Sequence, residues 1–316
     1  MKLVLEHSLE NIPLKLRYSY LSSKWVKRLI GTCIVIAIFF FLGRRLYIDW
    51  QELKDYDWHV QPFWLGLSFA FLILWWVALS LGWSFLLHRL KVNLSFKMGF
   101  KFWAISQLGR YLPGKFWHIL GRAYFCAEED IEKSVTVASA LLEIALMTIA
   151  AGLIFLLALP LMTSAHSLDI VFYILVIPLG LVSIHPLLFS RAFSFAAKKL
   201  RATEVQLDLS YLKMLSFVGI HATLWLLCGL AFFLFVNSIH RISWNEFFPV
   251  TATYAIAWIM GLLSVFAPGG LGVREGALGV LLTNYMPAPI AIVVALLSRI
   301  WFVGAEILCA AVAWRL

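Results

Sequence analysis

Long runs of apolar residues recur from one end of this chain to the other. A run of about 20 such residues is long enough for an α-helix to cross the hydrocarbon core of a bilayer. Seven runs meet this length and predict full membrane spans: Val26–Leu46, Phe63–Leu87, Val135–Leu159, Ile170–Phe189, Leu215–Phe235, Phe247–Phe266 and Ile290–Trp314. Two further apolar segments, Phe100–Leu120 and Gly272–Tyr285, are interrupted or short. The expected fold is an all-α polytopic transmembrane helical bundle.

The composition agrees with this pattern and excludes a large soluble part. Hydrophobic residues make up 62% of the 316 residues and charged residues only 14%, far from the balance of a soluble domain. We therefore predict a tail at residues 1–25 and a single integral membrane domain at residues 26–316. The four cysteines lack the spacing of metal ligands and are expected to be unpaired thiols. No metal, cofactor or nucleic-acid partner is predicted.

Lysine and arginine are unevenly distributed among the connecting segments. The tail up to Arg28 holds six, His88–Lys101 four and Ser190–Met214 five, whereas Pro160–Asp169 holds none. Because basic residues concentrate in cytoplasmic loops, the N-terminus is predicted to lie in the cytoplasm. Ser190–Met214 is expected to be an amphipathic linker along the cytoplasmic surface.

This orientation constrains the interrupted segment Phe100–Leu120. If it crossed the membrane fully, the basic loop Ser190–Met214 would lie outside. A re-entrant segment, which enters and leaves on the same side, avoids that conflict. Leu112-Pro113-Gly114-Lys115 lies at its centre, and a Pro-Gly pair breaks a helix.

A second Pro-Gly break occurs in Ser264–Gly279, which reads SVFAPGGLGVREGALG. Both breaks follow an apolar lead-in, precede a short helical piece with glycine and arginine, and come before a charge within an apolar helix. We therefore predict an internal repeat, in which two broken elements form a midplane binding site. The orientation of the last two segments stays open.

Backbone N–H groups that a helix break leaves free, together with arginine side chains inside the membrane, can bind an anion such as phosphate. A short helix that begins near Gly272 would present free N–H groups and a positive dipole end, with Arg274 in its first turn. Interfacial, solvated positions are the alternative for Arg110, Lys115 and Arg122. The candidate headgroup- and phosphate-binding residues are Arg110, Gly114, Lys115, Arg122, Gly269, Gly270, Gly272 and Arg274.

Four further charges belong to a predicted intramembrane network: Glu143, Glu275, Arg299 and Glu306. Such residues are costly in a bilayer unless paired or hydrated. They are either structural ion pairs, for instance Glu143 with Arg299, or proton and headgroup sites. Arg299 and Glu306 are two turns apart, so each is expected to find its partner elsewhere.

Other polar and aromatic features favour simpler interpretations. Asp55-Tyr56-Asp57 resembles the acidic motifs of membrane glycosyltransferases, but a solvated loop is the preferred interpretation. Tryptophans near span ends are predicted to be interfacial anchors; these are Trp58, Trp64, Trp103, Trp117, Trp244 and Trp314.

The residues around the two breaks also resemble the motifs of a known protein family. Leu112-Pro113-Gly114-Lys115 with Gly121-Arg122, and Ala267-Pro268-Gly269-Gly270-Leu271-Gly272 with Glu275, are similar to the lysylphosphatidylglycerol synthase transmembrane (flippase-like) family, as are Arg299 and Glu306. The family implies two re-entrant elements around a lipid-accessible cavity, and movement of anionic, aminoacylated or polyprenyl-phosphate-linked lipids between leaflets of the bacterial inner membrane.

The resemblance leaves the partners open. The chain ends without a cytosolic synthase domain, so synthesis of the aminoacylated lipid is not expected. The alternatives to a flippase are a membrane enzyme acting on a lipid-linked sugar, and an accessory subunit that docks a glycosyltransferase through Ser190–Met214. A homo-oligomer is also compatible with the sequence.

Overall fold

The protein is a bundle of α-helices. The structure is a computed structural model and describes residues 36–112, 116–162, 211–264 and 267–316, within which no strand occurs. The segments long and apolar enough to span a membrane are α4 (Pro62–Arg89), α7 (Lys133–Met162), α10 (Tyr211–Ile239), Trp244–Leu263 and α13 (Ala288–Trp314). The predicted all-α membrane bundle is confirmed.

The structure describes only part of the predicted span Val26–Leu46 and none of the predicted span Ile170–Phe189. Residues 36–48 are helical, and α3 (Trp50–Asp55) follows after one turn residue. Ile170–Phe189 and the tail lie outside the described residues. The predicted linker Ser190–Met214 is described only from Tyr211, where α10 begins.

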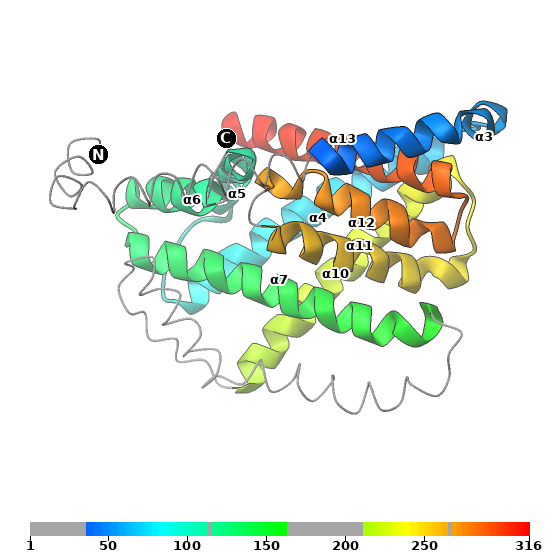
Figure 1. Cartoon of the computed structure of the whole chain (residues 1–316). Helices are drawn as coiled ribbons and strands as arrows, with labels where there is room; N and C mark the ends of the chain where they lie inside the picture. The colour runs from blue at the N-terminus through cyan, green and yellow to red at the C-terminus, as the bar shows by residue number, and fades with distance from the viewer. Residues whose placement is uncertain (1–35, 113–115, 163–210, 265–266) are drawn as a thin grey trace, which may run out of the picture.

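α10 lies at the centre of the bundle, between α4, α7 and α11 (Phe247–Leu263) (Figure 1). Large aromatic side chains fill this interior, and some of their N–H groups find partners there, whereas the indole nitrogens of Trp75 and Trp76 have none. Trp225 Nε1 donates to the Met147 carbonyl at 2.9 Å, and Trp301 Nε1 donates to Ser68 Oγ at 3.2 Å. These two bonds satisfy the buried N–H groups of Trp225 and Trp301 and tie α10 to α7 and α13 to α4.

The first break joins two short helices. α5 (Phe96–Gln107) begins at the N-cap Ser95 and continues as the 3₁₀ turn η1 (Leu108–Tyr111), before α6 (Trp117–Ala127). At 1.5 Å per residue, neither α5 nor α6 alone could cross about 30 Å of hydrocarbon. A Cβ atom on Gly109 would lie 2.9 Å from the His118 backbone nitrogen, so the two helices meet closely at this glycine.

The second break follows α11. The 3₁₀ turn η3 (Pro268–Gly270) leads into α12 (Val273–Leu281), and the turn η4 (Leu282–Asn284) then leads into α13. α12 lies beside α11 and α13 (Figure 1). The predicted helix start near Gly272 is confirmed, because Gly272 is the N-cap of α12.

Glycine is required at this break for two reasons. Gly269, Gly270 and Gly272 have φ angles of 59°, 72° and 81°, a region that other residues rarely adopt. A Cβ atom on Gly270 would also lie 2.8 Å from Gly261 Cα, so η3 packs directly on the backbone of α11. The re-entrant passage of both broken elements and the internal repeat stay predictions.

Candidate functional site

The two breaks, far apart in the sequence, are in contact. η1 lies against η3. A Cβ atom on Gly269 would lie 3.1 Å from the ring of Tyr111, the last residue of η1. Side chains of α13 surround this meeting point, so charges from three regions of the chain converge there.

Glu306 of α13 binds the first break. Its carboxylate accepts a hydrogen bond of 2.5 Å from the Tyr111 hydroxyl, and its other oxygen lies 3.3 Å from Arg110 Nε. The Glu306 side chain is fully buried, whereas Arg110 is partly exposed. Both partners therefore hold η1 against α13.

Arg299 and Glu275 bind the second break. Arg299 Nη1 donates to the Gly269 carbonyl at 3.0 Å and lies 3.5 Å from Glu275 Oε1. Glu275 Oε2 accepts the N–H of Gly272 at 2.7 Å. A carboxylate of the chain itself thus occupies the positive end of α12. As predicted, Arg299 and Glu306 find separate partners.

Arg274, on the first turn of α12, is a buried cation held between aromatic rings. Its guanidinium carbon lies 4.7 Å from the ring centroids of Tyr254 and Phe302, and it donates a hydrogen bond to the Tyr254 hydroxyl. No carboxylate in the described part of the chain forms an ion pair with it. Cation–π contact stabilises the charge without neutralising it.

We call this group the break cluster and define it by five residues: Arg110, Arg274, Arg299, Glu275 and Glu306. Three guanidinium groups face two carboxylates, which leaves an excess of one positive charge. Arg299 also has two buried nitrogens, Nε and Nη2, without a hydrogen-bond partner. These two form the forked edge of the guanidinium, which matches two oxygens of one phosphate.

The backbone of the second break is less available than the sequence suggests. The N–H groups of Gly270 and Gly272 donate to the Ala267 carbonyl and to Glu275. A phosphate at these amides would have to replace existing bonds. Gly114 and Lys115, the corresponding candidates of the first break, lie outside the described residues.

A second buried charge centre connects α6 with α7. Arg122 Nη1 lies 2.5 Å from Glu143 Oε2, and Trp103 Nε1 donates to Glu143 Oε1 at 2.8 Å. Arg122 is 1% exposed and also packs 4.7 Å from the centroid of Trp83. The interfacial alternative for Arg122 is therefore wrong.

The suggested ion pair of Glu143 with Arg299 is also wrong. The short helix α6 places Arg122 against Glu143, while Arg299 is engaged by η3 and Glu275. The face of α7 that carries Glu143 and other small or polar side chains lies in the interior of the bundle. Its members are all buried: Thr136, Ser139, Ala140, Glu143 and Met147.

Sequence reasoning missed three aromatic residues at these sites. Tyr111 adjoins the Pro-Gly motif, so its position was a usable signal, whereas Tyr254 lies in an apolar helix without one. Trp103, predicted to be an interfacial anchor, is 1% exposed and binds Glu143. It lies in the short helix α5, where the end of an apolar run is not the end of a membrane span.

The acidic motif of the enzyme alternative is at the surface. Asp55 and Asp57 are exposed, and the Asp57 carboxylate pairs with the exposed side chain of His59. Within the described ranges no group of three His, Cys, Asp or Glu side chains could hold a metal ion. The described cysteines Cys126, Cys228 and Cys309 are free and buried.

The sequence profile of the lysylphosphatidylglycerol synthase transmembrane region matches residues 28–303. The chain belongs to this family. The matched range contains both breaks and the break cluster except Glu306, and it agrees with a multi-pass membrane protein of lipid-related function. A comparison with curated proteins found no match.

Proposed function

We propose that this member of the lysylphosphatidylglycerol synthase transmembrane family is a lipid flippase. It moves phosphate-bearing lipids, either anionic or aminoacylated phospholipids or polyprenyl-phosphate-linked lipids, between the leaflets of the bacterial inner membrane. Its N-terminus lies in the cytoplasm. The break cluster binds the headgroup phosphate, and Lys115 and Gly114 of the first break belong to the same site.

The observation that carries the proposal is the excess of positive charge in the break cluster, in which Arg274 is buried, Arg299 nearly so and Arg110 partly exposed. An arginine near the bilayer centre costs about 2.5–3.5 kcal/mol on insertion scales. Three guanidinium groups with only two carboxylates therefore keep an unbalanced charge where it is expensive. A phosphate that binds there would neutralise the excess and strengthen the bound state.

The forked edge of Arg299 is the natural contact for that phosphate. In this structure it is closed by the second break, because a Cβ atom on Gly269 would lie 2.9 Å from Arg299 Nη2. Tyr111 covers the guanidinium from the first break, with its ring centroid 5.3 Å from the guanidinium carbon. Separation of η1 from η3 would expose the fork to a headgroup.

Leaflet exchange in proteoliposomes tests this function. Fluorescent phosphatidylglycerol would be followed with wild type, Arg274→Gln, and Arg315→Gln as the control, since Arg315 is an exposed arginine at the far end of α13. We expect exchange with wild type and the control, and a loss of about tenfold or more for Arg274→Gln, as one charge-assisted contact is removed. Exchange no faster than in empty vesicles, for this lipid and for a polyprenyl phosphate, would contradict the proposal.

A further inference from the structure

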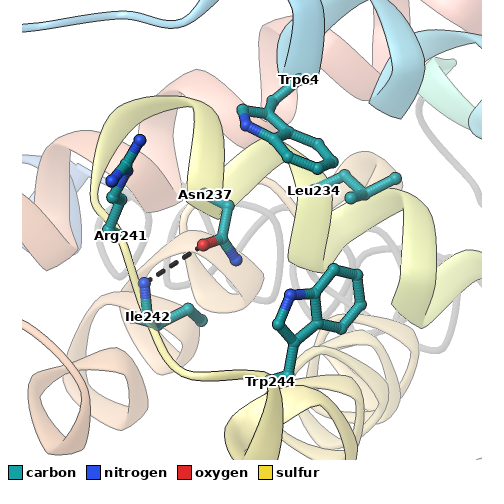
Figure 2. Close-up of a pocket in the computed structure, with 6 residues that line it drawn as sticks. All are labelled: Trp64, Leu234, Asn237, Arg241, Ile242 and Trp244. Carbon is teal, nitrogen blue, oxygen red and sulfur yellow. Dashed lines mark hydrogen bonds between the residues drawn. The ribbon is translucent and has the colours of Figure 1, made fainter.

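A cavity opens at one end of the bundle, beside the C-terminal end of α10 and the loop that leads to α11. Its volume is about 240 Å³. It is lined by Trp64, Leu234, Asn237, Arg241, Ile242 and Trp244, which Figure 2 shows around a common space. No member of the break cluster lines it, so this cavity is a separate site.

The walls of the cavity are held by hydrogen bonds. Asn237 Oδ1 accepts the N–H of Ile242 at 3.2 Å, and Asn237 Nδ2 donates to the Phe233 carbonyl at 3.0 Å (Figure 2 shows the first of these bonds). These bonds fix the loop after α10. The ring of Trp244 packs 4.9 Å from that of Phe233, which positions the indole.

Neighbouring segments support the same loop from its other side. The Gln61 N–H donates to the Ser238 carbonyl at 2.8 Å and ties the start of α4 to the end of α10. The Tyr56 hydroxyl lies 2.8 Å from His240 Nδ1. Burial lowers the pKa of His240 below its ordinary value, so it is neutral at pH 7 and Arg241 is the cation of this loop.

The side-chain groups left over on the cavity wall are hydrogen-bond donors. The Asn237 carbonyl oxygen is already used by Ile242. What remains are the Arg241 guanidinium, the indole N–H groups of Trp64 and Trp244, and one amide hydrogen of Asn237. In the described part of the chain Arg241 forms no ion pair. A wall of donors with one cation suits a ligand rich in acceptors and negatively charged.

The volume of the cavity and its position at the ends of the spans limit further which ligand it can hold. The cavity is smaller than the roughly 300–1,000 Å³ of pockets for drug-sized molecules, so it fits a headgroup rather than a whole lipid. It lies where two candidate spans begin and a third ends, at Pro62, Trp244 and Ile239. Tryptophan and arginine at span ends lie at the headgroup level of a bilayer. Phosphate groups of lipids are concentrated at that depth.

We propose that this cavity binds the phosphate of an anionic lipid headgroup at the membrane surface. The guanidinium of Arg241 contacts the phosphate oxygens, the two indoles enclose the headgroup, and the acyl chains stay in the adjoining leaflet. The proposal does not depend on transport, because a lipid can occupy this site in a protein that moves none.

Native mass spectrometry of the whole chain in detergent, titrated with phosphatidylglycerol, tests the site. All proteins would carry Arg274→Gln, so that the break cluster contributes little to the binding. We expect Arg241→Gln to weaken phosphatidylglycerol binding about tenfold, since one charge-assisted contact is lost. Arg315→Gln, which also removes an exposed arginine, should leave binding unchanged.

The possible results distinguish a lipid-headgroup site from a site for a soluble phosphate ester and from the absence of binding at Arg241. Equal binding by the Arg241→Gln and Arg315→Gln variants would overturn the proposal. Glycerol 3-phosphate, which has no acyl chains, would be added as a competitor. Displacement of the lipid only at large excess supports a lipid site, whereas displacement at equal concentration would assign the cavity to a soluble phosphate ester and contradict its occupation by lipid.

Discussion

The break cluster and the Arg122–Glu143 pair use the same residue types inside the bundle, but their charges differ. In the pair one arginine faces one glutamate at 2.5 Å, and tryptophans enclose both. In the break cluster three arginines face two glutamates, and Arg299 keeps two buried nitrogens without a partner. The balanced centre connects regular helices, whereas the unbalanced one lies where the helices are broken.

This difference separates stability from ligand binding. A balanced, enclosed ion pair needs no ligand, and its loss costs folding free energy because a lone buried charge remains. An excess charge between two breaks has the opposite property, because no carboxylate in the described part of the chain balances it and a ligand phosphate could do so. The comparison predicts that damage to one centre reduces stability and damage to the other reduces lipid movement.

The largest expected effect on stability is the removal of one member of the balanced pair. Arg122→Met leaves the Glu143 carboxylate buried without a counter-ion and should lower the free energy of unfolding by about 3–5 kcal/mol. Thermal unfolding in detergent measures this. The double variant Arg122→Met/Glu143→Leu should recover most of the loss, because no charge is left unpaired. An equally large loss in the double variant would contradict the ion-pair account.

A smaller loss is expected from a side chain at the second break. Gly270→Ala places a Cβ atom 2.8 Å from Gly261 Cα in a residue with φ of 72°. Backbone strain and overpacking together should cost about 3 kcal/mol. The control is Gly152→Ala, since a Cβ atom there meets nothing within 4 Å. Alanine within a helix should stabilise that position by about 0.5–1 kcal/mol; similar melting temperatures for both variants would disprove the close packing of η3.

Tyr111→Phe should have a moderate effect that is confined to the contact between the breaks. It removes the hydrogen bond of 2.5 Å to Glu306 and should destabilise the protein by about 1.5–3 kcal/mol. Because the ring remains, the packing over Arg299 is kept. Hydrogen exchange of η1 measures the effect locally. Unchanged protection of residues 108–112 would show that this bond does not hold the first break.

The smallest expected effect is a partial recovery of lipid exchange when the excess of one positive charge is restored. Arg274→Gln leaves two arginines against two glutamates, and the further change Glu306→Gln restores an excess of one positive charge. We expect the double variant to exchange fluorescent phosphatidylglycerol faster than Arg274→Gln alone, although slower than wild type. Rates for the double variant at or below those of the single variant would show that net charge is not what the site requires.

The sequence alone predicted much of this fold and part of its site. Length and apolarity located α4, α7, α10 and α13, because a bilayer sets the length of a span whatever its neighbours. The Pro-Gly pairs located both breaks, because proline and glycine act on the local backbone. The internal repeat, the lipid and the side of the N-terminus stay predictions.

Partners across the bundle were harder to predict. The sequence places Glu143 and Arg299 on interior faces, but which arginine meets which glutamate depends on how the α5–α6 hairpin packs. Tyr254 shows the same limit, since its hydroxyl is useful only because Arg274 of another helix lies beside it. Backbone amides at Gly270 and Gly272 were predicted to be free, but local turns and Glu275 occupy them.

The most direct test compares the two centres in one transport assay. Leaflet exchange of fluorescent phosphatidylglycerol would be measured in proteoliposomes for wild type, Arg274→Gln and Arg122→Met/Glu143→Leu, each checked for folding. The account predicts that Arg274→Gln loses about tenfold or more of the exchange rate, while the variant without the balanced pair retains most of it. Equal loss in both variants, or full exchange by Arg274→Gln, would contradict the claim that the excess charge at the breaks binds the lipid phosphate.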